Sequence, residues 1–157
     1  MLAVRSLIRG VLPHDLAGRP ARVKAAVIGD HDGDGGGVMF ERRGDTMARI
    51  MVINGITFPE DMVAAICRRH GAARLSLFGS ILRPPSPEGG YGFRPTSDVD
   101  ILVEFLPGAR PTLMSMARME GELSELIGRE VDLRTAGDLS RLFRDEVVTT
   151  ARLLHAA

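Results

Sequence analysis

The sequence predicts one compact domain of the α+β class, in which helices and short strands share a single hydrophobic core. At 157 residues and 45% hydrophobic composition, the chain is long enough to bury one core and too short for two generous domains. Apolar residues recur regularly after about residue 50, with a helical period in some stretches and strand-like runs in others. The predicted order is helix, strand, short helix, strand, helix, strand, helix.

The first 50 residues differ in composition from the rest of the chain. They contain prolines and a glycine-rich run, with only short apolar patches. We therefore expect a flexible or poorly ordered leader over residues 1–50 and the folded domain over residues 51–157. Met47 and Met51 lie at this join, which adds the hypothesis that the first 46 residues are dispensable.

The first regular element is a helix that ends before Gly71. Thr57 and Glu60 have the spacing of a capping box, and a glycine commonly follows the last turn of a helix. The apolar stripe that this helix turns toward the core consists of Met62, Val63, Ile66 and Cys67.

Three short runs predict strands. Residues 74–78 alternate in strand fashion up to Gly79, where a tight turn and a short helix are expected. After a stretch rich in proline and glycine, residues 99–105 form an apolar run typical of a largely buried strand. Residues 130–135 predict the third strand.

Two further helices follow the second and third strands. Thr112 is placed to cap the start of the first, and Gly128 follows its last turn. Its apolar stripe is Leu113, Met116, Leu123 and Ile127. The terminal helix is predicted from the spacing of Phe143, Val147, Ala151 and Leu154.

Three aspartates on the predicted strands are candidate catalytic and metal-binding residues. Successive strand side chains point to opposite faces, so Asp98 and Asp100 lie on one face roughly 7 Å apart. Asp132 follows the same logic on the third strand, because Val131 and Leu133 face the core. Like charges this close are costly without a cation, and carboxylate oxygens suit Mg²⁺. We therefore expect these aspartates to bind magnesium and to support phosphoryl displacement.

The turn after the first strand is a candidate phosphate-binding element. Gly79 lets the backbone approach a ligand closely, and Ser80 begins the short helix with free N–H groups. Arg83, one turn later, can add a charge-assisted contact to the same phosphates. Gly79, Ser80 and Arg83 are thus the expected nucleotide-binding residues.

Taken in order, the segments LFGSILR, SDVDILVEF and EVDLRT resemble the GSxxR, SDxD and distal Asp motifs of the minimal nucleotidyltransferases. These are small relatives of DNA polymerase beta, and the resemblance covers roughly residues 54–155. It implies a small mixed sheet, partly antiparallel, flanked by helices. It also implies that Gly79 and Ser80 hold the triphosphate, that Asp98 and Asp100 hold magnesium, and that Asp132 is the third acid.

Small members of this family resemble the antitoxin half of toxin-antitoxin pairs, in which AMP is attached to a tyrosine of an all-helical HEPN ribonuclease. The resemblance therefore implies an ATP-using protein adenylyltransferase that neutralises a cognate toxin. Two alternatives stay open. One is a small-molecule nucleotidyltransferase of the aminoglycoside type, and the other is a non-catalytic antitoxin that works by covering its toxin.

The sequence departs from this family pattern after Arg83. Pro84 and Pro85 follow where the family prefers a glycine, and the interval to Asp98 is longer than usual. The inserted segment SPEGGYGF is either a solvent loop or a lip over the nucleotide, with Tyr91 or Phe93 available for base stacking.

The leader also contains the pattern of an EF-hand calcium loop, at Asp30, Asp32, Asp34, Gly35 and Glu41. Gly37 stands where that loop carries an apolar residue, and Gly44 interrupts the exit helix. We therefore favour a flexible acidic glycine turn over a calcium site.

Composition narrows the remaining function classes. The 20 basic and 20 acidic residues cancel, which argues against a broad basic surface for duplex nucleic acid. The single cysteine, Cys67, lies in an apolar helical pattern and indicates a buried thiol in the reducing cytoplasm. No run approaches the roughly 18 apolar residues of a membrane span, so none is expected.

Overall fold

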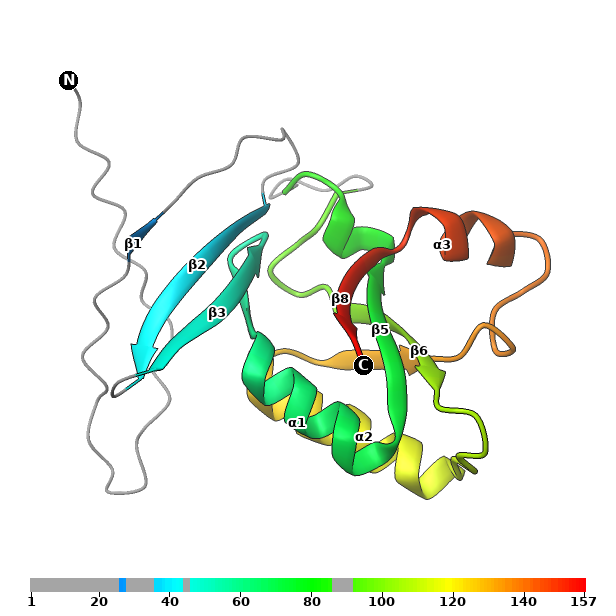
Figure 1. The fold of residues 1–157 in the computed structure, drawn as a ribbon. Helices are drawn as coiled ribbons and strands as arrows, with labels where there is room; N and C mark the ends of the chain where they lie inside the picture. The colour runs from blue at the N-terminus through cyan, green and yellow to red at the C-terminus, as the bar shows by residue number, and fades with distance from the viewer. Residues whose placement is uncertain (1–25, 28–35, 44–45, 86–91) are drawn as a thin grey trace.

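The computed structural model describes residues 26–27, 36–43, 46–85 and 92–157 (Figure 1). Within them, three α-helices and two four-stranded sheets are present, so the α+β class is confirmed. In chain order the elements are β1 (Ala26–Val27), β2 (Gly36–Arg43), β3 (Thr46–Ile53), β4 (Ile56–Pro59), α1 (Glu60–His70), β5 (Ala72–Phe78), the 3₁₀ helix η1 (Gly79–Leu82), β6 (Val99–Phe105), α2 (Leu113–Ile127), β7 (Val131–Arg134), α3 (Arg144–Thr150) and β8 (Arg152–Ala156).

The central sheet is mixed, as predicted. Its strand order is β7-β6-β5-β8, in which β5 runs antiparallel to both β6 and β8 while β6 and β7 are parallel. Helices α1 and α2 contact each other and pack on this sheet, α1 against β5 and α2 against β7 (Figure 1). The core between them is fully buried and includes Val63, Cys67, Leu75, Leu77, Ile101, Val103, Met119 and Leu123.

The opposite face of the central sheet is covered as well. Phe78, Leu102 and Leu139 form a second buried cluster, against which Val147 and Ala151 pack. Because both faces are covered, β5 is buried on both sides over its second half, and even Ser76 is 3% exposed. This explains why the β6 segment is a nearly continuous apolar run rather than an alternating one.

Helix α1 ends as predicted but begins differently. Gly71 takes the left-handed conformation at φ 68° and its N–H closes the last turn. Thr57, however, lies in β4, and α1 starts after Pro59 without a side-chain cap, so the predicted Thr57–Glu60 capping box is wrong. Pairing of β4 with β3 continues up to Pro59 and keeps Thr57 extended. Met62 of the predicted stripe is 38% exposed.

Helix α2 confirms both of its predicted ends. The Thr112 hydroxyl accepts the Ser115 N–H at 3.2 Å, the Ser115 hydroxyl accepts the Thr112 N–H at 2.8 Å, and Gly128 ends the helix at φ 65°. The predicted stripe is wrong at its first position, because Leu113 is 90% exposed. The helix is buried chiefly through Met119 and Leu123.

The predicted terminal helix is wrong in its second half. Helix α3 ends at Thr150, and the chain continues as strand β8, which pairs with β5. Leu154 is therefore buried from a strand and not from a helix. The free edge of β5 requires a hydrogen-bonding partner, and satisfying it overrides the local helical spacing of the apolar residues.

A second, antiparallel sheet precedes the central one. Its strand order is β1-β2-β3-β4, and β3 and β4 are joined by a two-residue turn at Asn54 and Gly55. The predicted boundary between residues 50 and 51 falls inside β3, where Ile50 is 7% exposed. Residues 1–25 and 28–35 lie outside the described part of the chain, so the flexible leader stays a prediction.

The predicted calcium-loop pattern also lies in this part of the chain. Most of the calcium-loop pattern lies outside the described residues, but Glu41 belongs to β2 and pairs with Ala48, so the pattern does not lead into the exit helix of an EF-hand.

Among the helices that the structure describes, none is long and apolar enough to cross a membrane.

Candidate active site

The predicted site residues gather at one edge of the central sheet. Phe78 at the end of β5 pairs with Asp100 near the start of β6, and Asp100 pairs in register with Asp132 of β7. Gly79 follows Phe78 directly, and Asp98 lies one residue before β6. Strand pairing therefore places the three acids and the glycine turn together. In the sequence, Asp98 follows Gly79 by 19 positions and Asp132 follows it by 53.

The turn is pressed against the middle aspartate. Gly79 adopts a left-handed conformation at φ 72°, and a Cβ atom there would lie 2.3 Å from the Asp100 Oδ2 atom. The backbone N–H of Ser80 hydrogen-bonds to the Asp100 carboxylate. Both the backbone conformation and the close approach therefore require glycine at position 79.

The three carboxylates influence one another electrostatically. Burial, followed by the negative charges of Asp98 and Asp132, raises the pKa of Asp100 from 3.8 to about 6. The Ser80 N–H and the Arg134 charge oppose this rise. Asp98 is exposed, whereas Asp100 and Asp132 are half-buried. The site thus concentrates negative charge at one edge, an arrangement that a bound cation would relieve.

Arg134 is a site residue that the sequence prediction missed. Its Nε lies 2.7 Å from Asp132 Oδ1 and its Nη2 lies 2.9 Å from Asp132 Oδ2, so the guanidinium grips both oxygens. The signal was available, because side chains two positions apart on a strand share a face. The hydrogen bond that Arg134 donates to Asp132, together with the negative charge of Asp132, raises the pKa of Arg134.

The fit of this edge to magnesium is partial. Asp98 and Asp100 offer the hard oxygen ligands that Mg²⁺ prefers. Within the described ranges, however, no group of three or more His, Cys, Asp or Glu side chains is arranged to hold a metal ion. Both Asp132 oxygens are directed to Arg134. The donor chemistry of the Asp98 and Asp100 pair fits, and recruitment of Asp132 requires its separation from Arg134.

The segment after η1 corrects one prediction. Arg83 is exposed and its backbone N–H donates to the Ser80 carbonyl at 3.0 Å. Phe93 is 4% exposed and packs in the core, with the Arg129 guanidinium 5.6 Å from its ring centre. Its ring is therefore not available to stack on a base. Tyr91 lies outside the described residues.

Asn54 is a second residue that the sequence prediction missed. It occupies the turn between β3 and β4, and its side-chain Nδ2 donates to the carbonyls of Ile81 at 2.7 Å and Arg83 at 2.8 Å. The Asn-Gly pair is a recognisable hairpin signal. The contact with η1 has no local signal, because 27 residues separate Asn54 from Ile81.

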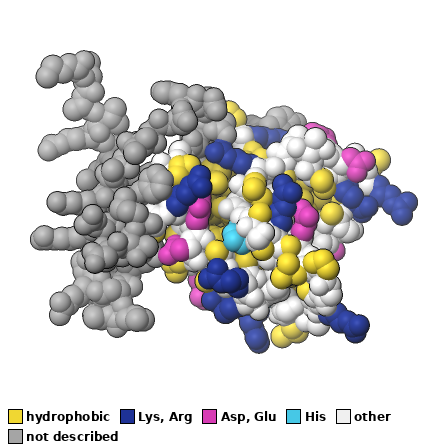
Figure 2. All heavy atoms as spheres, viewed as in Figure 1, with side chains coloured by type: hydrophobic (Ala, Val, Ile, Leu, Met, Phe, Trp, Pro, Cys, Tyr) yellow, Lys and Arg dark blue, Asp and Glu magenta, His cyan; other side chains and the backbone are white. Residues whose placement is uncertain are grey.

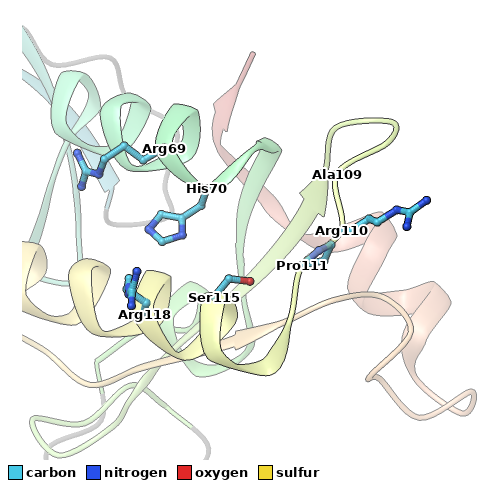
Figure 3. A pocket seen from close by; sticks show the side chains of 7 residues that line it. All are labelled: Arg69, His70, Ala109, Arg110, Pro111, Ser115 and Arg118. Carbon is cyan, nitrogen blue, oxygen red and sulfur yellow. The ribbon is translucent and has the colours of Figure 1, made fainter.

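A hollow of about 290 Å³ lies at the other end of β5 and β6, between the end of α1 and the start of α2. Figure 3 shows that the His70 ring points from α1 toward α2, where Ser115 and Arg118 lie, whereas Arg110 points away. None of the predicted site residues lines it. Figure 2 shows, on the face seen in Figure 1, basic and acidic side chains interspersed among the described residues.

Comparison with known proteins defines the class. The nucleotidyltransferase domain family matches residues 60–155, which span α1 to β8, and the chain belongs to that family. The protein is therefore a nucleotidyltransferase, as the motifs predicted. A curated relative from Methanocaldococcus jannaschii, named "putative protein adenylyltransferase", is 37% identical over 89 residues, which cover 57% of this chain and 86% of the relative.

Solved structures show weaker overall likeness. One, a "putative minimal nucleotidyltransferase", is 35% identical with a TM-score of 0.46 and covers 59% of this chain and 85% of that chain. Another, a toxin-antitoxin complex with AMP-PNP, is 19% identical with a TM-score of 0.47 and covers 64% of this chain and 75% of that chain. The family assignment rests on the domain match and the curated relative.

Proposed function

We propose that this protein transfers AMP from ATP to a hydroxyl group of a protein acceptor, with magnesium as cofactor. The observation that carries the proposal is the register of Phe78, Asp100 and Asp132 across three strands, which brings the glycine turn and the acids to one edge. The curated relative supports the choice of adenylyl transfer to a protein, because that is the activity in its name.

In the proposed reaction, the acceptor hydroxyl oxygen attacks the α-phosphorus of ATP. The bond from this phosphorus to the bridging oxygen breaks, and pyrophosphate leaves with the bonding electrons. Asp132, once an oxygen of it is released by Arg134, is the third acid and accepts the hydroxyl proton. Gly79 lets the turn lie close against Asp100. The Ser80 N–H, which hydrogen-bonds to Asp100 in the structure, contacts the triphosphate once Asp100 binds the metal, and Arg83 adds a charge-assisted contact.

Asp98 and Asp100 are the residues that hold magnesium in this proposal, with Asp132 joining them if Arg134 releases it. The metal supplies charge neutralisation of the triphosphate and of the leaving oxygen. The raised pKa of Asp100 supports this assignment, because burial and then the neighbouring charges of Asp98 and Asp132 disfavour its ionised form, which a bound cation would favour.

The acceptor that the motif resemblance implies is a tyrosine of an all-helical HEPN toxin. About 96 residues match the family, from 60 to 155, and such a small domain builds the nucleotide half of a site and leaves little to enclose a second substrate. We therefore propose that the acceptor surface comes from a separate protein, and that this chain acts as its antitoxin.

The test is to combine this protein with the product of its neighbouring gene, ATP and Mg²⁺. Catalytic neutralisation predicts that a small amount inactivates an excess of toxin and that the toxin gains the mass of one or more AMP groups. The Asp98→Asn variant should produce neither effect. Neutralisation only at equimolar ratio, without a mass change and equally by Asp98→Asn, would show a non-catalytic binding module instead. AMP transfer to an aminoglycoside but not to the protein would favour the small-molecule alternative.

We also propose that residues 51–157 hold the catalytic unit, that the first 46 residues are dispensable, and that the protein works in the reducing cytoplasm. The location is supported by Cys67, the single cysteine of the chain, which is a buried free thiol. Chains starting at Met47 and at Met51 test the boundary, because the second cuts β3 in its middle. Loss of transfer by the Met47 chain would assign a function to the leader.

A further inference from the structure

The turn between β3 and β4 is built to present one side chain. Asn54 and Gly55 both have positive φ, 48° and 77°, which is the two-residue type I′ turn of a tight hairpin. A non-glycine residue in this region is uncommon, and asparagine is one of the few that adopt it readily. The Asn54 amide nitrogen has two hydrogens, and the two contacts to Ile81 and Arg83 use both.

These contacts provide hydrogen-bond donors for the carbonyl groups at the C-terminal end of η1. The last carbonyls of a helix lack partners within the helix, and a 3₁₀ helix of four residues has weak internal hydrogen bonds. η1 is held at its start by the Ser80 N–H on Asp100 and in its middle by Ile81, which is fully buried. Asn54 holds its end, and it does so from the other sheet, before the residues that match the family.

We propose that Asn54 is a positioning residue for the nucleotide-binding turn. By anchoring the carbonyls of Ile81 and Arg83, it fixes Gly79 and Ser80 against the active edge, so the β3–β4 hairpin sets the geometry of the triphosphate site. This inference rests on the proposed function, in which Gly79 and Ser80 bind ATP. A displacement of about 1 Å in such an element is enough to weaken a site that depends on placement.

Two substitutions separate the side chain of Asn54 from its backbone conformation. Asn54→Gly keeps the positive φ and removes the amide, because glycine adopts this region freely. Asn54→Asp keeps the shape but replaces the two N–H donors with a carboxylate that faces two carbonyl oxygens. Gly71→Ala is the matched control: it strains another left-handed position, at φ 68°, at the opposite end of β5.

The first measurement is amide hydrogen exchange of the full chain without nucleotide. Loss of two neutral hydrogen bonds should raise exchange at residues 79–83 by roughly tenfold in both Asn54 variants. The second measurement is the KM for Mg²⁺-ATP and the kcat for AMP transfer to the toxin, well below the melting temperature. We expect KM to rise by roughly tenfold with a much smaller change in kcat, because triphosphate contacts are present before and during transfer. Gly71→Ala should change neither exchange at residues 79–83 nor KM.

The outcomes distinguish this inference from the proposed function. If the unsubstituted protein neither binds Mg²⁺-ATP nor transfers AMP, the proposed function fails and the nucleotide role of Asn54 fails with it. If the unsubstituted protein is active and both Asn54 variants match Gly71→Ala in exchange and in KM, only the role of Asn54 is overturned. A rise in both quantities confined to the Asn54 variants supports it.

Discussion

Charged side chains lie at both ends of strands β5 and β6. At one end a carboxylate has basic partners, whereas at the other end three carboxylates lie together. Where α1 meets α2, Glu122 contacts Arg69 and lies 3.2 Å from His70, and these partners lower the pKa of its carboxyl group. The carboxylate of this cluster therefore has two basic partners, and two more arginines, Arg110 and Arg118, line the hollow at this end. Such partly exposed ion pairs contribute modestly to stability.

At the opposite end, the carboxylates outnumber the cations. Asp98, Asp100 and Asp132 share the edge, and Arg134 grips Asp132 alone. Burial, and then the charges of Asp98 and Asp132, raise the pKa of Asp100 to about 6, which means that its ionised form is less favoured in the folded protein than in the unfolded chain. Crowded carboxylates cost stability without a bound cation, which is a reason to propose this end as the functional one.

The largest expected effect is the loss of transfer when one acid at the active end becomes neutral. Asp98→Asn or Asp100→Asn should lower the rate of AMP transfer by at least roughly a thousandfold, the upper range for removal of one preorganised electrostatic contact. Both variants should stay folded, because removing a repelling carboxylate does not destabilise the protein without metal. Glu122→Gln is the control and should transfer AMP at the original rate. Undiminished transfer by either asparagine variant would remove the acids from the mechanism.

The next effect concerns the turn and is measured as the dissociation constant for Mg²⁺-ATP. Gly79→Val should weaken binding severely, because its Cβ would overlap Asp100 Oδ2 and its backbone would be strained at φ 72°. Ser80→Ala should weaken binding by roughly three- to tenfold, since it keeps the backbone N–H and loses only the hydroxyl. Equal, unchanged affinity in both variants would exclude the turn from the site.

The contributions of the two ends to the free energy of unfolding should change with pH in opposite directions. With a folded-state pKa of about 6 against 3.8 unfolded, Asp100 holds a proton in the folded protein that the unfolded chain releases between roughly pH 4 and 6. Its contribution to the free energy of unfolding therefore falls as pH rises through this window. Glu122, whose pKa is lowered, loses its contribution as pH falls.

The free energy of unfolding, measured in urea with EDTA from about pH 4 to pH 7, tests this difference. Asp100→Asn should gain stability over the original protein near pH 7, and the gain should disappear toward pH 4. Glu122→Gln should show the reverse trend, with its largest loss near pH 7. A constant difference for Asp100→Asn at all pH values would contradict the raised pKa.

The smallest effect is expected at the compensated end. Glu122→Gln removes a partly exposed carboxylate with two cationic partners, so it should cost about 0.5–1 kcal/mol of unfolding free energy, with less cost at high salt. Nucleotide binding should not change. A loss of ATP affinity in this variant would mean that the Glu122 end influences nucleotide binding, which would contradict the separate roles given to the two ends.

Several elements were predictable because their signals are local. The ends of α2 follow from Thr112 and Gly128, whose preferences for a capping position and a left-handed conformation depend only on their neighbours in sequence. The strand around Leu77 ends at Gly79 for the same kind of reason. The placement of Asp100 and Asp132 on strands was likewise predictable, because alternate residues of a buried strand share a face and the acids take the face that the apolar residues leave. Asp98, which was also expected on the strand, lies one residue before β6.

Other features were decided by contacts between distant segments. Leu154 has a helical spacing with its neighbours, yet it lies in β8 because β5 needed a partner on its free edge. Phe93 belongs to a segment rich in glycine and proline, yet it is buried in the core. No local preference predicts either result, since each depends on which surface the folded chain leaves uncovered.

The active edge shows the division most clearly. Local sequence determined the chemical groups, because the glycine turn and the strand aspartates carry their own conformational preferences and their own charge. Tertiary structure determined the environment of those groups: burial in the folded sheet raises the pKa of Asp100, and pairing of β6 with β7, which sets Asp132 beside it, adds to the rise. The physical reason is that conformational preferences act over a few residues, whereas burial and electrostatic interaction depend on distances in space that only the folded chain establishes.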